Sequence, residues 1–138
     1  MSVEENKALV RSLIDDVWRN GRLDRLPLYW SQDCVNHADP SPQNAGLGAL
    51  RNYHEQFAGA FAAFSDMAID VSQQIAEGDR VVTQIATRGK HTGDFRGVPP
   101  TGRVATLATI GIDRIHGGKI AEHWSVADMA GLINQLSP

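Results

Sequence analysis

The sequence is poor in cysteine. Cys34 is the one cysteine among 138 residues, so no disulfide can form within the chain. Proteins that fold without disulfides are typical of a reducing compartment, and we expect a cytoplasmic location. The N-terminal stretch MSVEENKALV has no basic segment followed by an apolar one, which argues against a secretory signal.

Long apolar runs and an excess of positive charge are also absent. No segment approaches the roughly 18 consecutive apolar residues that a membrane span needs. The chain carries 13 Lys and Arg against 16 Asp and Glu, a formal net charge of -3. A negative chain lacks the electrostatic footprint of a nucleic-acid-binding protein. We therefore expect neither a membrane nor a nucleic acid as partner, which leaves small molecules and other protein chains.

The familiar catalytic motifs are missing as well. The sequence has no GxGxxG fingerprint, no P-loop and no GxSxG elbow, and its five histidines show neither HxH nor HExxH spacing. The sequence therefore predicts no metal site and no bound cofactor.

The apolar residues change period halfway along the chain. A capping box at Ser2 and Glu5 precedes apolar pairs at helical spacing up to Asn20-Gly21, and helical spacing returns between residues 47 and 64. Residues 67–75, 80–91, 104–112 and 120–126 alternate like strands around the turns EGD and HGGK, and residues 128–138 close as a helix. We expect one domain, 1–138, of α+β class: a cone-shaped, curved antiparallel sheet with helices packed on one face.

A polar cluster lies where the last strand meets the final helix. The period of two places Ala121, His123 and Ser125 on one face, and we expect the neighbouring strand to turn Ala105, Leu107, Thr109 and Gly111 toward the same interior. Small residues leave space beside an imidazole, so His123 is a candidate acid-base group. A structural reading stays open, in which His123 is a core histidine bonded to a carbonyl. Asp128 either tunes the site or caps the helix, since Ser125 and Asp128 fit the S-x-x-[DE] pattern.

Other candidates are less clearly placed. His37, Arg88 and His91 form a second set that could supply an alternative acid-base group or an anion contact at the pocket mouth. His54 is interpreted as packing or pocket wall. Trp18 and Tyr53 belong either to the core or to the wall of a pocket for a flat hydrophobic ligand.

Two stretches, HTGDFRGVPPTGR and DRIHGGKIAEHWSVADMAGLINQL, resemble the SnoaL-like polyketide cyclases, or ester cyclases, of the nuclear transport factor 2-like superfamily. The resemblance implies an α+β cone, no cofactor, a homodimer and a deep pocket for aromatic polyketide-like compounds. It also implies an intramolecular aldol ring closure started by a general base.

The same resemblance carries over only some site residues. Asn36 and His123 match pocket positions of these cyclases, and His91 matches a histidine after the same strand. Ser125 stands where the cyclases have the aspartate credited with proton transfer, Gly111 where they have a second pocket histidine, and Thr109 where they have a glutamine. A lone serine hydroxyl is far too weak an acid or base to replace a carboxylate.

The predicted function is therefore that of a SnoaL-like cyclase acting without cofactor on a small apolar carbonyl compound, with His123 as acid or base and Asn36 and Ser125 as orienting groups. Three alternatives remain: a non-catalytic binding module with the same cone, a cofactor-free hydroxylation-type member of the family, and a structural dimerisation domain whose pocket is filled by side chains.

Overall fold

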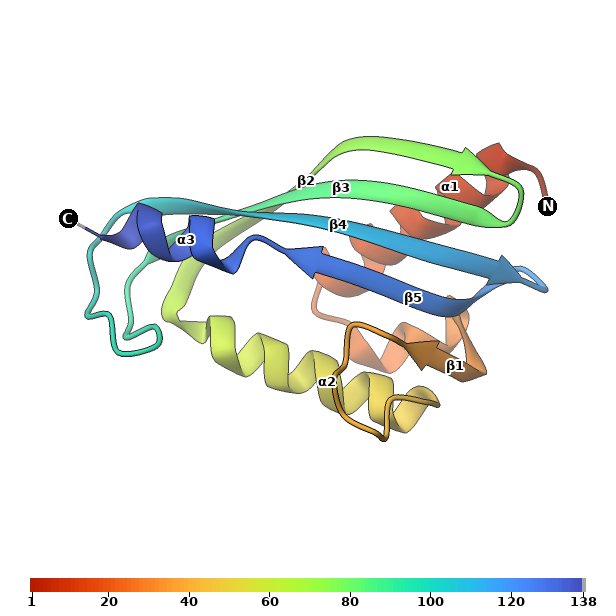
Figure 1. Cartoon of the computed structure of the whole chain (residues 1–138), viewed down its shortest axis with the longest axis horizontal. Coiled ribbons are helices and arrows are strands. Elements are labelled where there is room, and N and C mark those ends of the chain that lie inside the picture. Colours follow the sequence, from red (N-terminus) through yellow and green to blue (C-terminus); the bar gives the residue numbers. More distant parts are fainter. Residues whose placement is uncertain (138) are drawn as a thin grey trace.

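The computed structural model describes residues 1–137 of the chain (Figure 1). The helical elements are α1 (Val3–Leu13), its π-helical continuation η1 (Ile14–Arg19), the 3-10 helix η2 (Leu23–Leu28), α2 (Leu47–Ala60), the 3-10 turn η3 (Phe61–Ala63) and α3 (Met129–Leu136). The strands are β1 (Trp30–Asn36), β2 (Phe64–Glu77), β3 (Arg80–His91), β4 (Val104–His116) and β5 (Lys119–Ala127).

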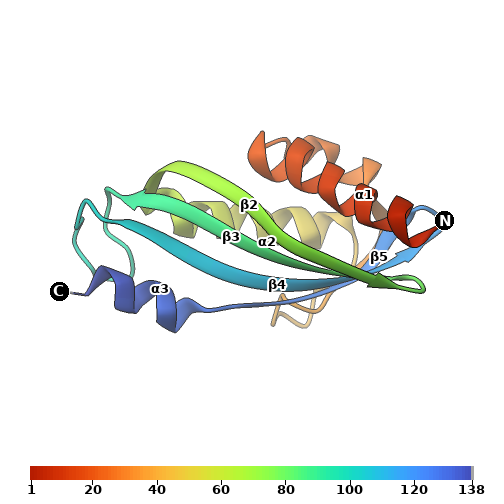
Figure 2. The ribbon, with the colours of Figure 1, turned by 90° about the horizontal axis from the view of Figure 1, so that it is seen from above.

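Within these residues the strands form one curved sheet in the order β1-β5-β4-β3-β2. The predicted α+β class with a curved sheet is confirmed, and the meander from β2 to β5 is antiparallel as expected. The prediction of a wholly antiparallel sheet is wrong at one edge, because β1 runs parallel to β5. Seen from above, α1 and α2 lie on the same side of the sheet (Figure 2).

The first helix forms as its sequence predicts. The Ser2 side chain accepts a hydrogen bond from the Glu5 backbone N–H at 3.1 Å, which caps the first turn. The helical path ends at Gly21, where φ is +65°, a conformation that glycine adopts without strain. The buried face of this segment, which includes Leu13 and Val17, packs onto the sheet.

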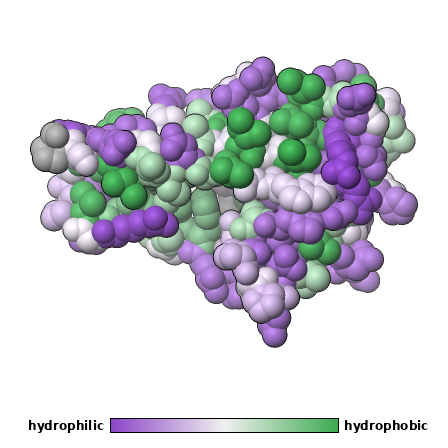
Figure 3. All heavy atoms as spheres, in the orientation of Figure 1, coloured by the Kyte–Doolittle hydropathy of each residue, from purple (hydrophilic) through white to green (hydrophobic). Residues whose placement is uncertain are grey.

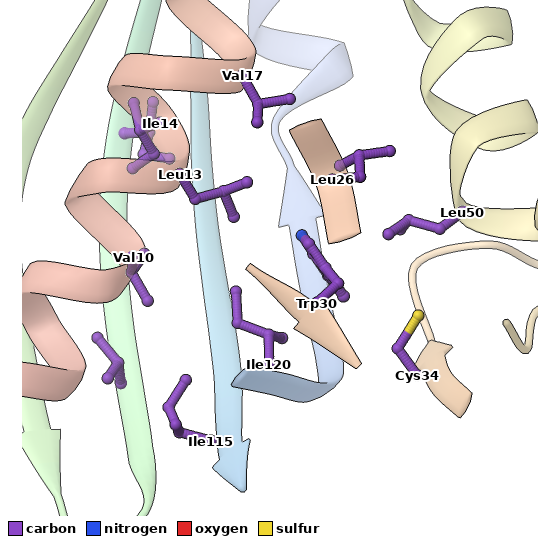
Figure 4. Packing of buried hydrophobic residues seen from close by; sticks show 12 residues of the cluster. Val10, Leu13, Ile14, Val17, Leu26, Trp30, Cys34, Leu50, Ile115 and Ile120 are labelled. Carbon is purple, nitrogen blue, oxygen red and sulfur yellow. The ribbon is translucent and has the colours of Figure 1, made fainter. Parts of the chain in front are cut away.

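The main core lies between the helices and the sheet (Figure 4). It joins residues of α1 and η1 to Leu26 of η2, Trp30 and Cys34 of β1, and Ile120 of β5. Leu50 is the one buried residue among the 14 of α2, and it points toward Trp30 and Leu26. Leu47 at the start of this helix is partly buried against the same core.

A second cluster occupies the other end of the sheet. Leu132 and Leu136 of α3 pack with Ala105 and Leu107 of β4 and with Phe95. The structure therefore places Ala105 and Leu107 inside this cluster, and not beside His123 as the alternation alone suggested. The strand is long enough, at 13 residues, to cross both clusters.

A bulge in β5 changes which residues face inward. Ile115 lies opposite Ile120, but Arg114 lies opposite Glu122, so Ala121 has no partner on β4. Ile120 is fully buried whereas Ala121 is partly exposed. The extra residue interrupts the alternation, so Ala121 does not belong to the regular inward set with His123 and Ser125.

Candidate functional site

The centre of the candidate site is a paired aspartate and histidine. The bulge places Asp113 of β4 directly opposite His123 of β5, and Asp113 Oδ1 lies 2.7 Å from His123 Nδ1. The side chains of His123 and Asp113 are only 12% and 5% exposed. A carboxylate accepts hydrogen bonds, so it holds the proton on Nδ1 and leaves Nε2 of the neutral ring as an acceptor. This arrangement is that of a general base held in one orientation.

Beside the pair lies a cavity of about 40 Å³ between the N-terminal helix and the sheet. Its walls come from α1 and η1 and from the inner face of three strands: Val10, Leu13, Ile14, Trp18, Thr83, Ile85, Thr109, Gly111, Asp113, His123 and Ser125. A volume of this size holds a few water molecules or one small functional group. Apolar walls with a few convergent polar groups are typical of small-molecule sites.

Gly111 supplies the space for the histidine ring. It lies opposite Ser125 in the ladder, and a Cβ at this position would come within 3.1 Å of His123 Cε1. Any larger residue would push the imidazole out of its present place. The absence of a side chain at 111 is thus part of how the ring is held against Asp113.

The helical wall carries aromatic and polar groups close together. Trp18 lines the cavity, and its ring centre lies 6.0 Å from that of His54 on α2. Tyr53 packs edge-on against His54 at 5.7 Å. Burial, with a smaller contribution from repulsion by His123, lowers the pKa of His54 from 6.5 to about 4. The ring of His54 is therefore neutral near pH 7.

Asn36 ends β1 and His37 follows it, and the two side chains lie in different environments. Asn36 is buried opposite His123 in the parallel ladder, and its Oδ1 accepts a hydrogen bond from the Ala38 backbone N–H at 3.1 Å. His37 lies outside, where Nε2 is 2.8 Å from Glu122 Oε2 and the ring stacks on Trp124 at 4.7 Å. Hydrogen bonds from His37 and then Arg114 lower the pKa of Glu122.

The second candidate set is not brought together. His91 is fully buried, and its Nδ1 accepts from the Thr101 backbone N–H at 3.2 Å. It lies eight residues beyond Thr83 on β3, roughly 26 Å along the strand at about 3.3 Å per residue, so it is remote from His123. Arg88 is exposed and pairs with Asp70 at 3.5 Å on the outer face.

Asp128 is a capping residue in the structure. It is exposed, it precedes α3, and its Oδ1 accepts from the Gly131 backbone N–H at 2.8 Å. Ser125 does not take part in the cap, because it lies within β5 and lines the cavity. The two residues that matched one short motif therefore have separate positions.

Sequence reasoning missed Asp113. The alternation that selects Thr109 and Gly111 reaches Asp113 one step further along β4, so the signal for an inward carboxylate was present. Its partner could not be assigned in the same way. Pairing counted back from the turn at Gly117 and Gly118 without a bulge would set Asp113 opposite Glu122.

Across residues 1–137 no three His, Cys, Asp or Glu side chains cluster in a way that could hold a metal ion. The buried thiol of Cys34 has a raised pKa, mainly because of burial, and lies within the hydrophobic core. Among the described helices none is long and apolar enough to cross a membrane.

The curved sheet, the helices on one side and the pocket between them define an α+β cone of the nuclear transport factor 2-like class. Residues 8–136 match the model of the SnoaL-like polyketide cyclases, and the chain belongs to this family.

Individual relatives agree with this assignment. The chain is 30% identical over 121 residues to nogalonic acid methyl ester cyclase of Streptomyces nogalater, covering 86% of this chain and 88% of the relative. AclR of Streptomyces galilaeus, proposed to be a hydroxylase, is 32% identical with a TM-score of 0.78, over 98% of this chain and 82% of AclR. IdmH of Streptomyces antibioticus, proposed to be a polyketide cyclase, is 27% identical with a TM-score of 0.80, over 95% and 97% of the two chains.

Proposed function

We propose that this protein binds a small, enolisable carbonyl compound of polyketide type and closes a ring in it by acid-base catalysis without a cofactor. The observation that carries the proposal is the Asp113–His123 pair at the wall of the cavity, with 2.7 Å between Oδ1 and Nδ1. The substrate class is suggested by the nogalonic acid methyl ester cyclase to which the chain is similar.

The chemistry uses the free nitrogen of His123. Nε2 takes a proton from the carbon next to the carbonyl, the C–H electron pair becomes the enolate, and Asp113 stabilises the imidazolium that forms. The enolate carbon then attacks a second carbonyl of the same molecule, forming the C–C bond. The new alkoxide takes the proton back from Nε2. Protons and electrons balance in this sequence with no further reactant.

The pair also accounts for the change at position 125. In this proposal the carboxylate acts through the imidazole from position 113, and the Ser125 hydroxyl orients the substrate. Ser125 and Thr109 both line the cavity on the same side as His123. A hydroxyl suits this role because it can donate to a carbonyl oxygen and accept from a substrate hydroxyl.

The size of the cavity limits what enters it. About 40 Å³ accommodates the reacting carbonyl group but not a ring system. Small ketones are therefore expected to bind most readily.

The test is exchange of α-protons for deuterium in ketones of increasing size, from butanone to a bicyclic aromatic ketone, followed by NMR. The protein accelerates the exchange of at least one of them, His123→Ala reduces the acceleration by at least about 10-fold, and Asp113→Asn reduces it to an intermediate extent. Arg88→Ala, on the outer face, is the matched control and leaves it unchanged. Acceleration that survives in His123→Ala would refute the proposal, and no acceleration at all would favour a binding module.

The similarity to AclR supports a second candidate, a hydroxylation. The enolate formed by His123 can add dioxygen at carbon, and the peroxide then takes the proton from Nε2 to give a hydroperoxide. Reduction of this hydroperoxide to the alcohol needs two electrons from an external thiol or nicotinamide reductant. Oxygen consumption that depends on both substrate and His123 would favour this reaction. Ring closure under nitrogen at an undiminished rate would exclude it.

We further propose that the chain forms a homodimer through the outer face of its sheet. Two cross-strand rows of this face are apolar: Ile75, Val82 and Ile112 in one, and Ile110 and Val126 in the other. Ile110 and Val126 are 50% and 78% exposed. Figure 3 shows hydrophobic side chains gathered on this face. Contiguous exposed apolar surface is typical of an interface.

A further inference from the structure

Three nitrogen atoms around the site are buried and have no hydrogen-bond partner: Trp18 Nε1, Trp30 Nε1 and His54 Nε2. A buried polar group without a partner costs on the order of 1–3 kcal/mol, and groups left so in a native protein call for an explanation. The indole nitrogens can only donate, and the neutral imidazole of His54 can donate through Nε2. This side of the site therefore offers hydrogen-bond donors for which the protein supplies no acceptor.

One of the three lies in the cavity wall, and a second packs directly against it. Trp18 lines the cavity together with His123, and the ring of His54 lies 6.0 Å from that of Trp18. His54 is also close enough to His123 for the two imidazoles to repel each other. Trp30 packs edge-on against His123 at 5.6 Å but is enclosed in the main core, whereas His54 is partly exposed beside the cavity wall. We therefore leave Trp30 out of the inference.

The two sides of the cavity are chemically unlike. The sheet side carries the carboxylate and the imidazole that can accept a proton, and the helical side carries donors on apolar aromatic rings. A carbonyl compound that loses an α-proton becomes negatively charged at oxygen. The group that stabilises it must donate hydrogen bonds to that oxygen from a low-dielectric wall.

We propose that Trp18 Nε1–H and His54 Nε2–H form the oxygen-binding half of the site and donate hydrogen bonds to the carbonyl oxygen of a neutral ligand and to its enolate. The inference deepens the proposed function and rests on it for the enolate, but not for the binding of the carbonyl oxygen. It also specifies the ligand class. An uncharged ketone or β-diketone fits two donors of this kind, and a cation does not.

A neutral histidine is suited to donating a hydrogen bond to the ligand oxygen. Because His54 lacks a proton-accepting partner and stays uncharged, it can donate one hydrogen bond without competing with His123 for the substrate proton. Tyr53 and Trp18 pack against its ring and fix its orientation. The donor is thus held in place before the ligand arrives.

The test uses 2,4-pentanedione, a β-diketone small enough to probe the reacting-group site, and protein labelled with ¹⁵N. The chain has 3 tryptophans, so the indole N–H signals are few and each is assigned from its Trp→Phe variant. We expect the Trp18 indole signal to move downfield saturably, as a new hydrogen bond requires. Trp124, which stacks on His37 outside the site, is the matched control and does not move.

Variants test donation apart from packing. Trp18→Phe keeps an aromatic ring without the N–H, and we expect about 10-fold weaker binding of the diketone, as for loss of one hydrogen bond to its carbonyl oxygen. His54→Leu weakens binding similarly, and His54→Gln, which restores an N–H donor, recovers most of it. Trp124→Phe binds as the wild type does. Retained Trp30 and Trp124 indole signals show that Trp18→Phe and the two His54 variants are folded, and the Trp18 and Trp30 signals show the same for Trp124→Phe.

The outcomes separate this inference from the proposed function. If the wild type does not bind the diketone, if the Trp18 signal stays still at saturation, or if His54→Gln binds no better than His54→Leu, the inference is wrong. If α-proton exchange is not accelerated but the Trp18 signal moves, the donors bind oxygen and the catalytic proposal fails alone. If exchange depends on His123 while Trp18→Phe and His54→Leu react at the wild-type rate, only the inference fails.

Discussion

Gly111 and His123 are in near contact: a Cβ on Gly111 would lie 3.1 Å from Cε1 of the imidazole. This separation is tighter than normal packing, so a methyl group at 111 must displace the ring by a few tenths of an ångström. The neighbouring ring atom, Nδ1, is hydrogen-bonded to Asp113, and Trp30 packs edge-on against the ring. The position of the proposed base therefore depends on a residue without a side chain.

We predict that Gly111→Ala lowers His123-dependent α-proton exchange by about 10-fold, because small misplacements of a reacting group are costly. Exchange is measured by NMR and folding by circular dichroism. The control is Gly59→Ala on α2, where nothing lies within 4 Å of the added methyl and the free energy of unfolding should rise by about 0.5–1 kcal/mol. Wild-type exchange in Gly111→Ala would show that the ring tolerates the shift.

Acid should destabilise the protein through His54. Its pKa is about 4 in the folded chain against 6.5 for the ordinary group, so between these values the unfolded chain binds more protons. The contribution of neutral His54 to the free energy of unfolding is complete above pH 6.5 and is lost as the pH falls toward 4. From pH 7 to pH 5 the loss is about 2 kcal/mol in the free energy of unfolding.

Urea unfolding of the wild type and of His54→Leu, at both pH values, isolates this contribution, since other groups titrate alike in both proteins. The stability difference, wild type minus variant, should fall by about 2 kcal/mol on acidification. A difference that does not vary with pH would mean that His54 is not held neutral by burial.

Cys34 should resist alkylation. Its side chain is fully buried in the main core, and burial raises the pKa of its thiol, so little reactive thiolate is available. We expect iodoacetamide to label the native protein at least about 100-fold more slowly than the urea-unfolded protein, as followed by mass spectrometry. Rapid labelling of the native chain would mean that the core around Cys34 opens to solvent on the timescale of the reaction.

A charge on the outer face should abolish the proposed dimer. Ile110→Lys and Val126→Lys put a charge opposite an apolar neighbour in the β4–β5 ladder, and sedimentation velocity should show a monomer for each. Leu28→Lys is the control, because Leu28 is 54% exposed on η2, away from that face, and should leave the dimer intact. A wild-type monomer at micromolar concentration would refute the proposal.

Local patterns predicted most of the elements, because each is determined by residues close in sequence. The capping box at Ser2 and the four-residue spacing after it specify α1, and the turn glycines specify where the strands reverse. The pairing of β1 with β5 could not be predicted, since it joins segments about 90 residues apart and nothing local indicates its direction. The sequence therefore predicted the α+β class, but it did not predict the parallel strand at the edge of the sheet.

The candidate site was predicted only in part, for a similar reason. The alternation of β4 and β5 selected Thr109, Gly111, His123 and Ser125, which the structure places together on the cavity wall. It did not give the register between the two strands, so Asp113 was overlooked as the partner of His123. His54 and Trp18 come from separate helices, and only the three-dimensional arrangement brings them near each other.

The unpaired residue in β5 bears on how family sequences should be compared. Ala121 is the position that β4 leaves without a partner, with Ile115 opposite Ile120 on one side and Arg114 opposite Glu122 on the other. A homologue one codon shorter here would keep the same aspartate facing the same imidazole across a regular ladder. A single-residue gap at this point in an alignment is therefore compatible with an intact pair of aspartate and histidine.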